Sequence, residues 1–193
     1  MQTLKAIAQR RSIRKYKDTP VTDEQIRALL HAATLAPSGK NRQPWRFGVV
    51  RGEKRAEMIT TIRAGMEKLK ALGADLGSSP WTVQIMERAP VTILVFNDDM
   101  ILDSGEKPLT AQDMVFNSVN VQSIGAAIQN LLLAAHDMGL GTLWICDVFY
   151  AYPELCAWLG ETHQLIAAVA VGYPDEEPSA RPRKSVDEVT RWL

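Results

Sequence analysis

The chain has 193 residues, 46% of them hydrophobic, and its 22 basic residues balance 22 acidic ones. This length is enough for one well-formed core and short for two, so we expect a single domain spanning residues 1–193. The balanced charge argues against a nucleic-acid-binding or membrane-surface protein, and the lack of an apolar signal sequence or a run of about 18 apolar residues predicts a cytoplasmic protein.

The first predicted element is a short helix carrying Leu4 and Ile7, and a basic segment, RRSIRKY, follows it at residues 10–16. The guanidinium groups and the serine hydroxyl of this segment could hold a phosphate group. The alternative is a solvated helix end, where Lys and Arg favour the negative terminus of the helix dipole. The segment alone leaves both interpretations open.

A second helix is predicted to begin at Thr22 with a capping box and to end near Ala36, because Pro37 disfavours helical geometry in the residue before it. The loop APSGKNRQPW follows at residues 36–45, before a predicted strand at 46–50. Two prolines stiffen this loop, and several of its short side chains can form hydrogen bonds. Such loops often carry binding residues, so we interpret it as a binding loop.

The next part of the chain alternates helices, loops and a strand. The pattern predicts a helix at 54–72, a loop at 73–81, a helix at 82–89, a buried strand at 91–96 and a polar loop at 97–110.

A long helix and a short strand are predicted between residues 112 and 146. Apolar residues cover nearly the whole circumference at 124–135, which is typical of a buried helix, so Gln122, Gln129 and Asn130 would need internal partners. Gly139 or Gly141 can take the left-handed conformation that ends a helix, and a strand is predicted at 142–146. Backbone amides brought together by glycines suit a planar cofactor, but the same pattern is ordinary in α/β proteins.

The last third of the chain is predicted to hold a short helix from Pro153 to Gly160, a buried strand at 165–171 and an extended, surface-packed segment at 173–184, for which a free tail is the alternative. The two cysteines have no metal-binding spacing and are interpreted as small core residues. The three histidines are interpreted as structural or solvated.

Four stretches of the chain resemble motifs of the nitroreductase family of flavoenzymes, in the family's order: RRSIRKY at 10–16, APSGKNRQPW at 36–45, AIQNLLLAAHDMGLGTLW at 127–144 and AVAVGYPDEEPSARPRK at 168–184. Four ordered matches across most of the chain argue against coincidence. The resemblance implies an α+β sandwich with a mostly antiparallel central sheet flanked by helices. It also implies an intertwined homodimer with FMN at the subunit interface and the long helix in the dimer core.

The resemblance further implies three groups of cofactor-binding residues. The FMN phosphate and ribityl chain would contact Arg10, Arg11, Ser12 and Arg14, together with Arg181 and Arg183, which have Lys184 beside them. The loop of the neighbouring subunit would place Pro37, Ser38, Asn41 and Gln43 against the flavin, so a lone monomer should hold FMN poorly. The segment beside the isoalloxazine, with backbone amides near its N5, would be Trp144, Ile145, Cys146 and Asp147.

The implied activity is an FMN-dependent oxidoreductase that takes hydride from NAD(P)H and passes it through flavin N5 to a small acceptor, such as a nitroaromatic or a quinone, in a ping-pong cycle. No catalytic side chain is expected, because the flavin carries the chemistry. Many relatives have a small residue where this chain has Cys146 and Asp147, which motivates a flavin carrier or redox sensor with little turnover as the alternative. The family's variable region makes Trp81, Met86 and the 97–110 loop candidates for substrate selection.

Overall fold

The computed structural model describes residues 3–101 and 110–193, and its centre is a four-stranded sheet in the order β1-β2-β4-β3. All three neighbouring strand pairs are antiparallel. The strands are β1 (Trp45–Arg51), β2 (Val91–Ile101), β3 (Gly141–Ile145) and β4 (His163–Gly172). The α+β architecture with a mostly antiparallel sheet is therefore confirmed.

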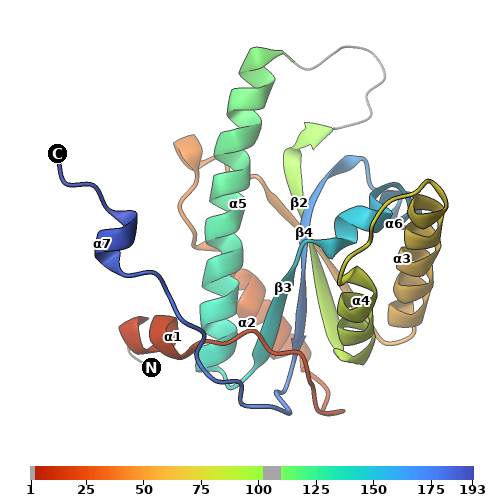
Figure 1. The fold of residues 1–193 in the computed structure, drawn as a ribbon, viewed down its shortest axis with the longest axis horizontal. Helices are drawn as coiled ribbons and strands as arrows, with labels where there is room; N and C mark the ends of the chain where they lie inside the picture. Colours follow the sequence, from red (N-terminus) through yellow and green to blue (C-terminus); the bar gives the residue numbers. More distant parts are fainter. Residues whose placement is uncertain (1–2, 102–109) are drawn as a thin grey trace.

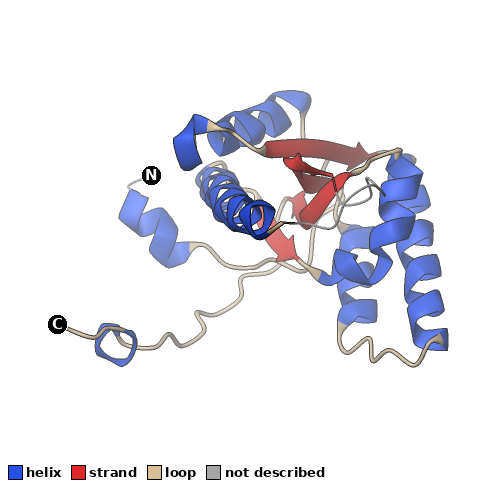
Figure 2. Ribbon diagram, turned by 90° about the horizontal axis from the view of Figure 1, so that it is seen from above, coloured by secondary structure: helices blue, strands red, loops and turns tan. Residues whose placement is uncertain are grey.

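Helices cover both faces of this sheet (Figures 1 and 2). One face packs against α2 (Asp23–Thr34) and α5 (Ala111–Asp137), and the other packs against α3 (Lys54–Ala71), α4 (Ser79–Arg88) and α6 (Tyr152–Leu159). Both sides of the central strands are buried, so Ile93 and Leu94 of β2 belong to different hydrophobic clusters. The remaining helices are α1 (Thr3–Gln9), two 3₁₀ turns at Gly39–Asn41 and Asp147–Ala151, and α7 (Val186–Val189).

Two predicted boundaries are wrong. Helix α4 begins at Ser79 and not at residue 82, because Pro80 fits the first turn of a helix, where its missing N–H costs nothing. Strand β2 continues through a register shift after Asn97 and ends at Ile101, so the predicted loop begins too early. The rest of that predicted loop, residues 102–109, lies outside the described residues.

The long helix α5 is buried along one face of its C-terminal half. Ile124, Ile128 and Leu131 are fully buried, whereas Met114 and Val115 near its start are 62% and 63% exposed. The Asn130 amide donates to the Ala32 carbonyl oxygen at 3.2 Å, as its burial required, but Gln122 is exposed and needs no internal partner. The single chain therefore leaves an apolar surface uncovered on the N-terminal half of α5.

The chain after β4 is extended, as predicted, but from residue 179 it leads away from the body of the molecule to α7 (Figure 1), so the predicted surface packing of residues 173–184 is wrong beyond Pro178. Residues 179–193 are all exposed. None of the described helices is both long enough and apolar enough to cross a bilayer. Nor do residues 3–101 and 110–193 contain three or more His, Cys, Asp or Glu side chains grouped to hold a metal ion.

Candidate functional site

The basic segment at residues 10–16 lies against the free edge of β3. Ser12 forms a parallel bridge with Thr142, and the backbone N–H of Ile13 donates to the Thr142 carbonyl oxygen at 2.9 Å. Gly141 makes this approach possible, because a Cβ atom at that position would lie 2.8 Å from the Ile13 side chain. The edge of β3 therefore fixes where the basic segment runs.

The chain that follows β4 forms hydrogen bonds with the same basic segment. The backbone N–H of Lys17 donates to the Tyr173 carbonyl oxygen, and that of Asp175 donates to the Lys15 carbonyl oxygen, both at 2.9 Å. The Glu176 carboxylate accepts from the backbone N–H of Arg14 and, at 3.2 Å, from that of Lys15. Two segments from opposite ends of the sequence thus form one structural unit.

A cavity of about 590 Å³ lies beside this unit, between the start of the basic segment, the turn after α5 and the chain after β4. Arg10 and Arg11 line it, together with His136. Burial lowers the pKa of the Arg10 guanidinium, and the nearby positive charges of Arg183 and Arg11 lower it further. Arg10 and Arg11 thus place two positive charges at the cavity, and Arg183 adds a third near Arg10, an arrangement that suits a phosphate dianion.

The other groups around the cavity modify this positive charge. Burial lowers the pKa of His136, and Arg10 and Arg11 act in the same direction against the opposing charge of Asp137. The His136 Nε2 atom is buried and has no hydrogen-bond partner among the described residues. Glu176 and Glu177 line the same cavity, but the Glu176 carboxylate is already occupied by the two backbone N–H groups.

The other three arginines predicted to bind the cofactor do not line this cavity in the single chain. The Arg14 guanidinium donates to the Ser12 carbonyl oxygen at 3.2 Å and lies over the ring of Trp81, so it does not line the cavity. Arg181 and Arg183 are exposed, and the Arg183 guanidinium donates to the Arg181 carbonyl oxygen at 3.3 Å. The charge of Arg183 nevertheless lies close enough to Arg10 to lower the pKa of its guanidinium.

The end of β3 presents an open strand edge. Beyond the bridge at Thr142, β3 pairs only with β4 in the described part of the chain, so the outer backbone groups near Trp144 and Ile145 have no strand partner. Trp144 is 39% exposed, whereas Ile145 is buried in the core, so Ile145 can offer only its backbone. The unpaired N–H and C=O groups of such an edge can form hydrogen bonds with another molecule.

The interpretation of Cys146 as a core residue is wrong, because Cys146 is exposed where the chain leaves β3. Burial of the thiol itself and the charge of Asp147 raise its pKa, opposed by a hydrogen bond to Trp144. A raised pKa disfavours the thiolate, which is the form in which cysteine acts as a nucleophile. Cys156 is partly buried, and neither cysteine forms a disulfide.

The polar loop between α2 and β1 lies far from the cavity of the same chain. Its 3₁₀ turn contacts the middle of α5, where the backbone N–H of Gly39 donates to Ser123 Oγ at 3.3 Å. Ser123 and His136 are 13 residues apart on α5, which corresponds to about 20 Å along a helix. Of the predicted loop residues, Pro37, Asn41 and Gln43 are exposed and Ser38 is partly buried, with its Oγ accepting from the Gln43 backbone N–H at 3.0 Å.

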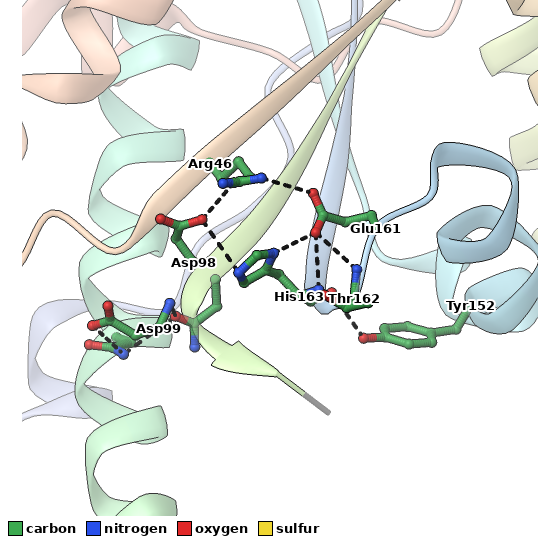
Figure 3. A network of polar contacts seen from close by, with 9 residues as sticks. Arg46, Asp98, Asp99, Tyr152, Glu161, Thr162 and His163 are labelled. Carbon is green, nitrogen blue, oxygen red and sulfur yellow. Dashed lines mark hydrogen bonds and ion pairs between the residues drawn. The ribbon is translucent and has the colours of Figure 1, made fainter. Parts of the chain in front are cut away.

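Sequence reasoning missed a charged network at the end of the sheet where β1 begins (Figure 3). Arg46 of β1 pairs with Asp98 of β2 at 2.5 Å and with Glu161 at 3.4 Å, and the His163 ring lies between the same two carboxylates. Burial would raise the pKa of Glu161, but hydrogen bonds from His163 and from the backbone N–H of Thr162 lower it to about 2. Only strand register brings these residues together, so no local motif could have revealed them.

The residues suggested for substrate selection divide into two kinds. Trp81 is 53% exposed in the first turn of α4 and remains available to a ligand. Met86 is 1% exposed in the core below α4, so the suggestion that it selects substrates is wrong. Met86 lies on the same inner face of α4 as the buried Thr82 and Val83, four and three residues before it, as the helical period requires.

Comparison with known proteins gives a consistent result. The profile described as "Nitroreductase family" matches residues 7–173. A protein from Archaeoglobus fulgidus, provisionally named NADH dehydrogenase/NAD(P)H nitroreductase, is 34% identical over 91% of this chain and 87% of its own length. A provisionally assigned nitroreductase from Desulfovibrio desulfuricans, solved in complex with FMN, is 31% identical with a TM-score of 0.77, over 100% of this chain and 97% of its own. A BluB-like flavoprotein from Clostridium difficile is 28% identical with a TM-score of 0.81, over 100% and 99% of the two chains.

Proposed function

This chain belongs to the nitroreductase family, and we propose that it is an FMN-dependent oxidoreductase that takes hydride from NAD(P)H and passes it to a small acceptor such as a nitroaromatic or a quinone. The observation that carries the proposal is the cavity lined by Arg10 and Arg11, with the charge of Arg183 near Arg10. These residues come from opposite ends of a chain with no net charge, so a local anion is the simplest reason for their meeting. The FMN complex of the Desulfovibrio relative supports the choice of anion.

Different residues of the chain would bind the phosphate and the ring of the cofactor. Arg10 and Arg11 would bind the phosphate, and Arg183 of the C-terminal segment would contact the same phosphate. The open edge of β3 at Trp144 and Ile145, together with Cys146 and Asp147 just after the strand, would offer backbone hydrogen bonds to the flavin ring. Bound FMN would accept and release hydride at its N5 atom, and the protein would orient the ring and control access to it.

A second copy of the chain would complete the site. The polar loop and the basic cavity are separated by about 20 Å along α5 of one chain, so both reach one cofactor only if each comes from a different subunit. The uncovered apolar residues Met114 and Val115 on α5 fit a homodimer interface, because surfaces of this kind rarely remain exposed to water. We therefore propose an intertwined homodimer with FMN at its interface.

The test is the visible absorption spectrum of the purified protein, followed by anaerobic addition of NADPH and, in a separate sample, NADH. A flavin spectrum that bleaches with either donor and returns when a quinone is added supports the proposed activity. A colourless protein that also fails to bind added FMN would overturn it. The relative rates of bleaching with NADPH and NADH identify the preferred donor.

The flavin carrier or redox sensor is the second candidate, and the exposed Cys146 with the adjacent carboxylate of Asp147 favours it. A negative charge near the ring would disfavour the anionic reduced flavin, and so would slow turnover. The same experiment separates the two candidates. A flavin spectrum that persists with both nicotinamide donors but bleaches with dithionite identifies the carrier or sensor.

A further inference from the structure

The polar loop contains an unusual concentration of left-handed backbone. Lys40, Asn41 and Gln43 have φ angles of 54°, 54° and 52°, although none of them is glycine. This conformation is unfavourable for residues that carry a Cβ atom, and it persists only where surrounding contacts enforce it. Between them, Arg42 alone has right-handed backbone angles, with φ −69° and ψ −27°.

Arg42 also has the contacts that could enforce this arrangement. Its guanidinium lies over the Phe116 ring of α5, with 4.7 Å between Cζ and the ring centroid. Its Nε atom lies 3.7 Å from the Asp99 carboxylate of β2, which also accepts from the Asn120 amide at 3.3 Å. Asp99 stands beside α5 at the end of the charged network (Figure 3), so two elements of the fold hold one side chain of the loop.

The two ends of the loop are fixed by other contacts. Gly39 lies so close to α5 that a Cβ atom there would meet Val119 at 2.4 Å. At the other end, the Pro44 carbonyl oxygen accepts from the backbone N–H of Asp98 at 2.8 Å. Among the described residues, Arg42 therefore provides the side-chain contacts that tie the middle of the loop to the rest of the fold.

We propose that Arg42 is a positioning residue for the cofactor site of a second copy of this chain. Its contacts with Phe116 and Asp99 hold Asn41 and Gln43 on either side of it in left-handed backbone, so that both exposed side chains face the neighbouring subunit's flavin. Arg42 acts through its neighbours and need not touch the flavin. This inference rests on the proposed function, because it takes FMN as the ligand that the loop contacts.

The experiment measures the dissociation constant of FMN by quenching of flavin fluorescence on titration with apoprotein, together with the thermal midpoint and the oligomeric state of each variant. We expect Arg42→Ala to raise the dissociation constant about tenfold, and Arg42→Lys to raise it nearly as much, because lysine lacks the planar group that stacks on Phe116. The matched control is Arg63→Ala, which removes an exposed ion pair with Glu87 on the far face of the sheet. It should leave the dissociation constant unchanged.

A rescue variant separates positioning from general stabilisation. Lys40→Gly places a residue without Cβ at a left-handed position, which lowers the cost of the loop conformation whether or not Arg42 is present. In the Arg42→Ala background it should restore at least half of the lost affinity. Amide hydrogen exchange at residues 39–43 of the apoprotein should accelerate in Arg42→Ala and slow again in the double variant.

The outcomes distinguish the two proposals. If wild-type protein binds FMN and Arg42→Ala binds it equally tightly, the positioning role is overturned while the proposed function stands. The positioning role also fails if the loss of affinity in Arg42→Ala accompanies loss of the dimer and Lys40→Gly restores neither. If wild-type protein does not bind FMN, the proposed function fails and the role of Arg42 at a flavin fails with it.

Discussion

The guanidinium of Arg14 lies over the indole of Trp81, with 5.7 Å between Cζ and the ring centroid. The contact joins the basic segment to the first turn of α4, two elements that are far apart in the sequence. Arg14 is one of the residues predicted to hold the cofactor. Because it contacts Trp81, its orientation depends on α4, a helix that carries no predicted cofactor ligand. Trp81 is therefore a residue through which α4 can influence the site.

Replacing Trp81 by Leu removes this contact and should raise the FMN dissociation constant about two- to fivefold, since a cation–π contact at an exposed site contributes about 0.5–1 kcal/mol. Trp81→Phe retains an aromatic face and should remain closer to wild type. Fluorescence titration of the apoproteins measures both. Equal affinities for the Leu and Phe variants would show that the stacking has no effect on cofactor binding.

Replacing Arg10 or Arg183 by Ala should weaken FMN binding about tenfold or more, because each charge-assisted hydrogen bond contributes about 1.5–3 kcal/mol. The loss should be absent when riboflavin, which has no phosphate, replaces FMN in the same titration. Lys70→Ala, an exposed position on α3, serves as the matched control. If FMN and riboflavin lose affinity equally, these arginines do not bind the phosphate.

The charged network at the end of the sheet should make stability depend on pH in the acid range. The pKa of Glu161 falls from its ordinary value of 4.5 to about 2 in the folded chain. Its contribution to stability is therefore complete above about pH 4.5 and is lost as the pH falls towards 2. Urea unfolding between pH 6 and pH 2.5 should show this loss in wild type, and Glu161→Gln should show a shallower decline. Parallel curves for the two proteins would contradict the assignment.

Gly141 should tolerate no side chain. A Cβ atom there would lie 2.8 Å from Ile13, so Gly141→Ala should lower the free energy of unfolding by about 1–3 kcal/mol and displace the basic segment from β3. Gly48→Ala is the control, because the nearest atoms to its added Cβ are at 3.7 and 3.8 Å. If Gly141→Ala and Gly48→Ala lower the free energy of unfolding equally, the close approach of Ile13 does not restrict position 141.

Much of the fold could be predicted from local patterns. The capping box at Thr22, the left-handed Gly139 after α5 and the apolar runs of β2 and β4 all lie where the sequence indicated. The errors arose where one residue type has two uses. The sequence predicts Pro80 within a loop, but Pro80 lies in the first turn of α4; it also predicts that a loop begins at Asn97, but β2 continues beyond this residue.

The candidate site was less predictable, because its parts are separated in sequence or in space. Resemblance pointed to Arg10 and Arg183, and the structure brings their charges together. Burial at a strand end depends on which edge of the sheet the strand occupies, so the sequence could not show that Cys146 is exposed. The network around His163 depends on the register of three strands, which no local pattern encodes.

The hydrogen bonds between the basic segment and the chain after β4 also determine when the cavity can form during synthesis of the chain. Arg14 and the Glu176 that accepts from its backbone N–H are separated by 162 residues, so Arg14 is synthesised well before Glu176. Arg10 and Arg11 are synthesised before Pro174–Pro178, which form another wall of the same cavity. The proposed phosphate site can therefore form only after the chain has been synthesised through Pro178.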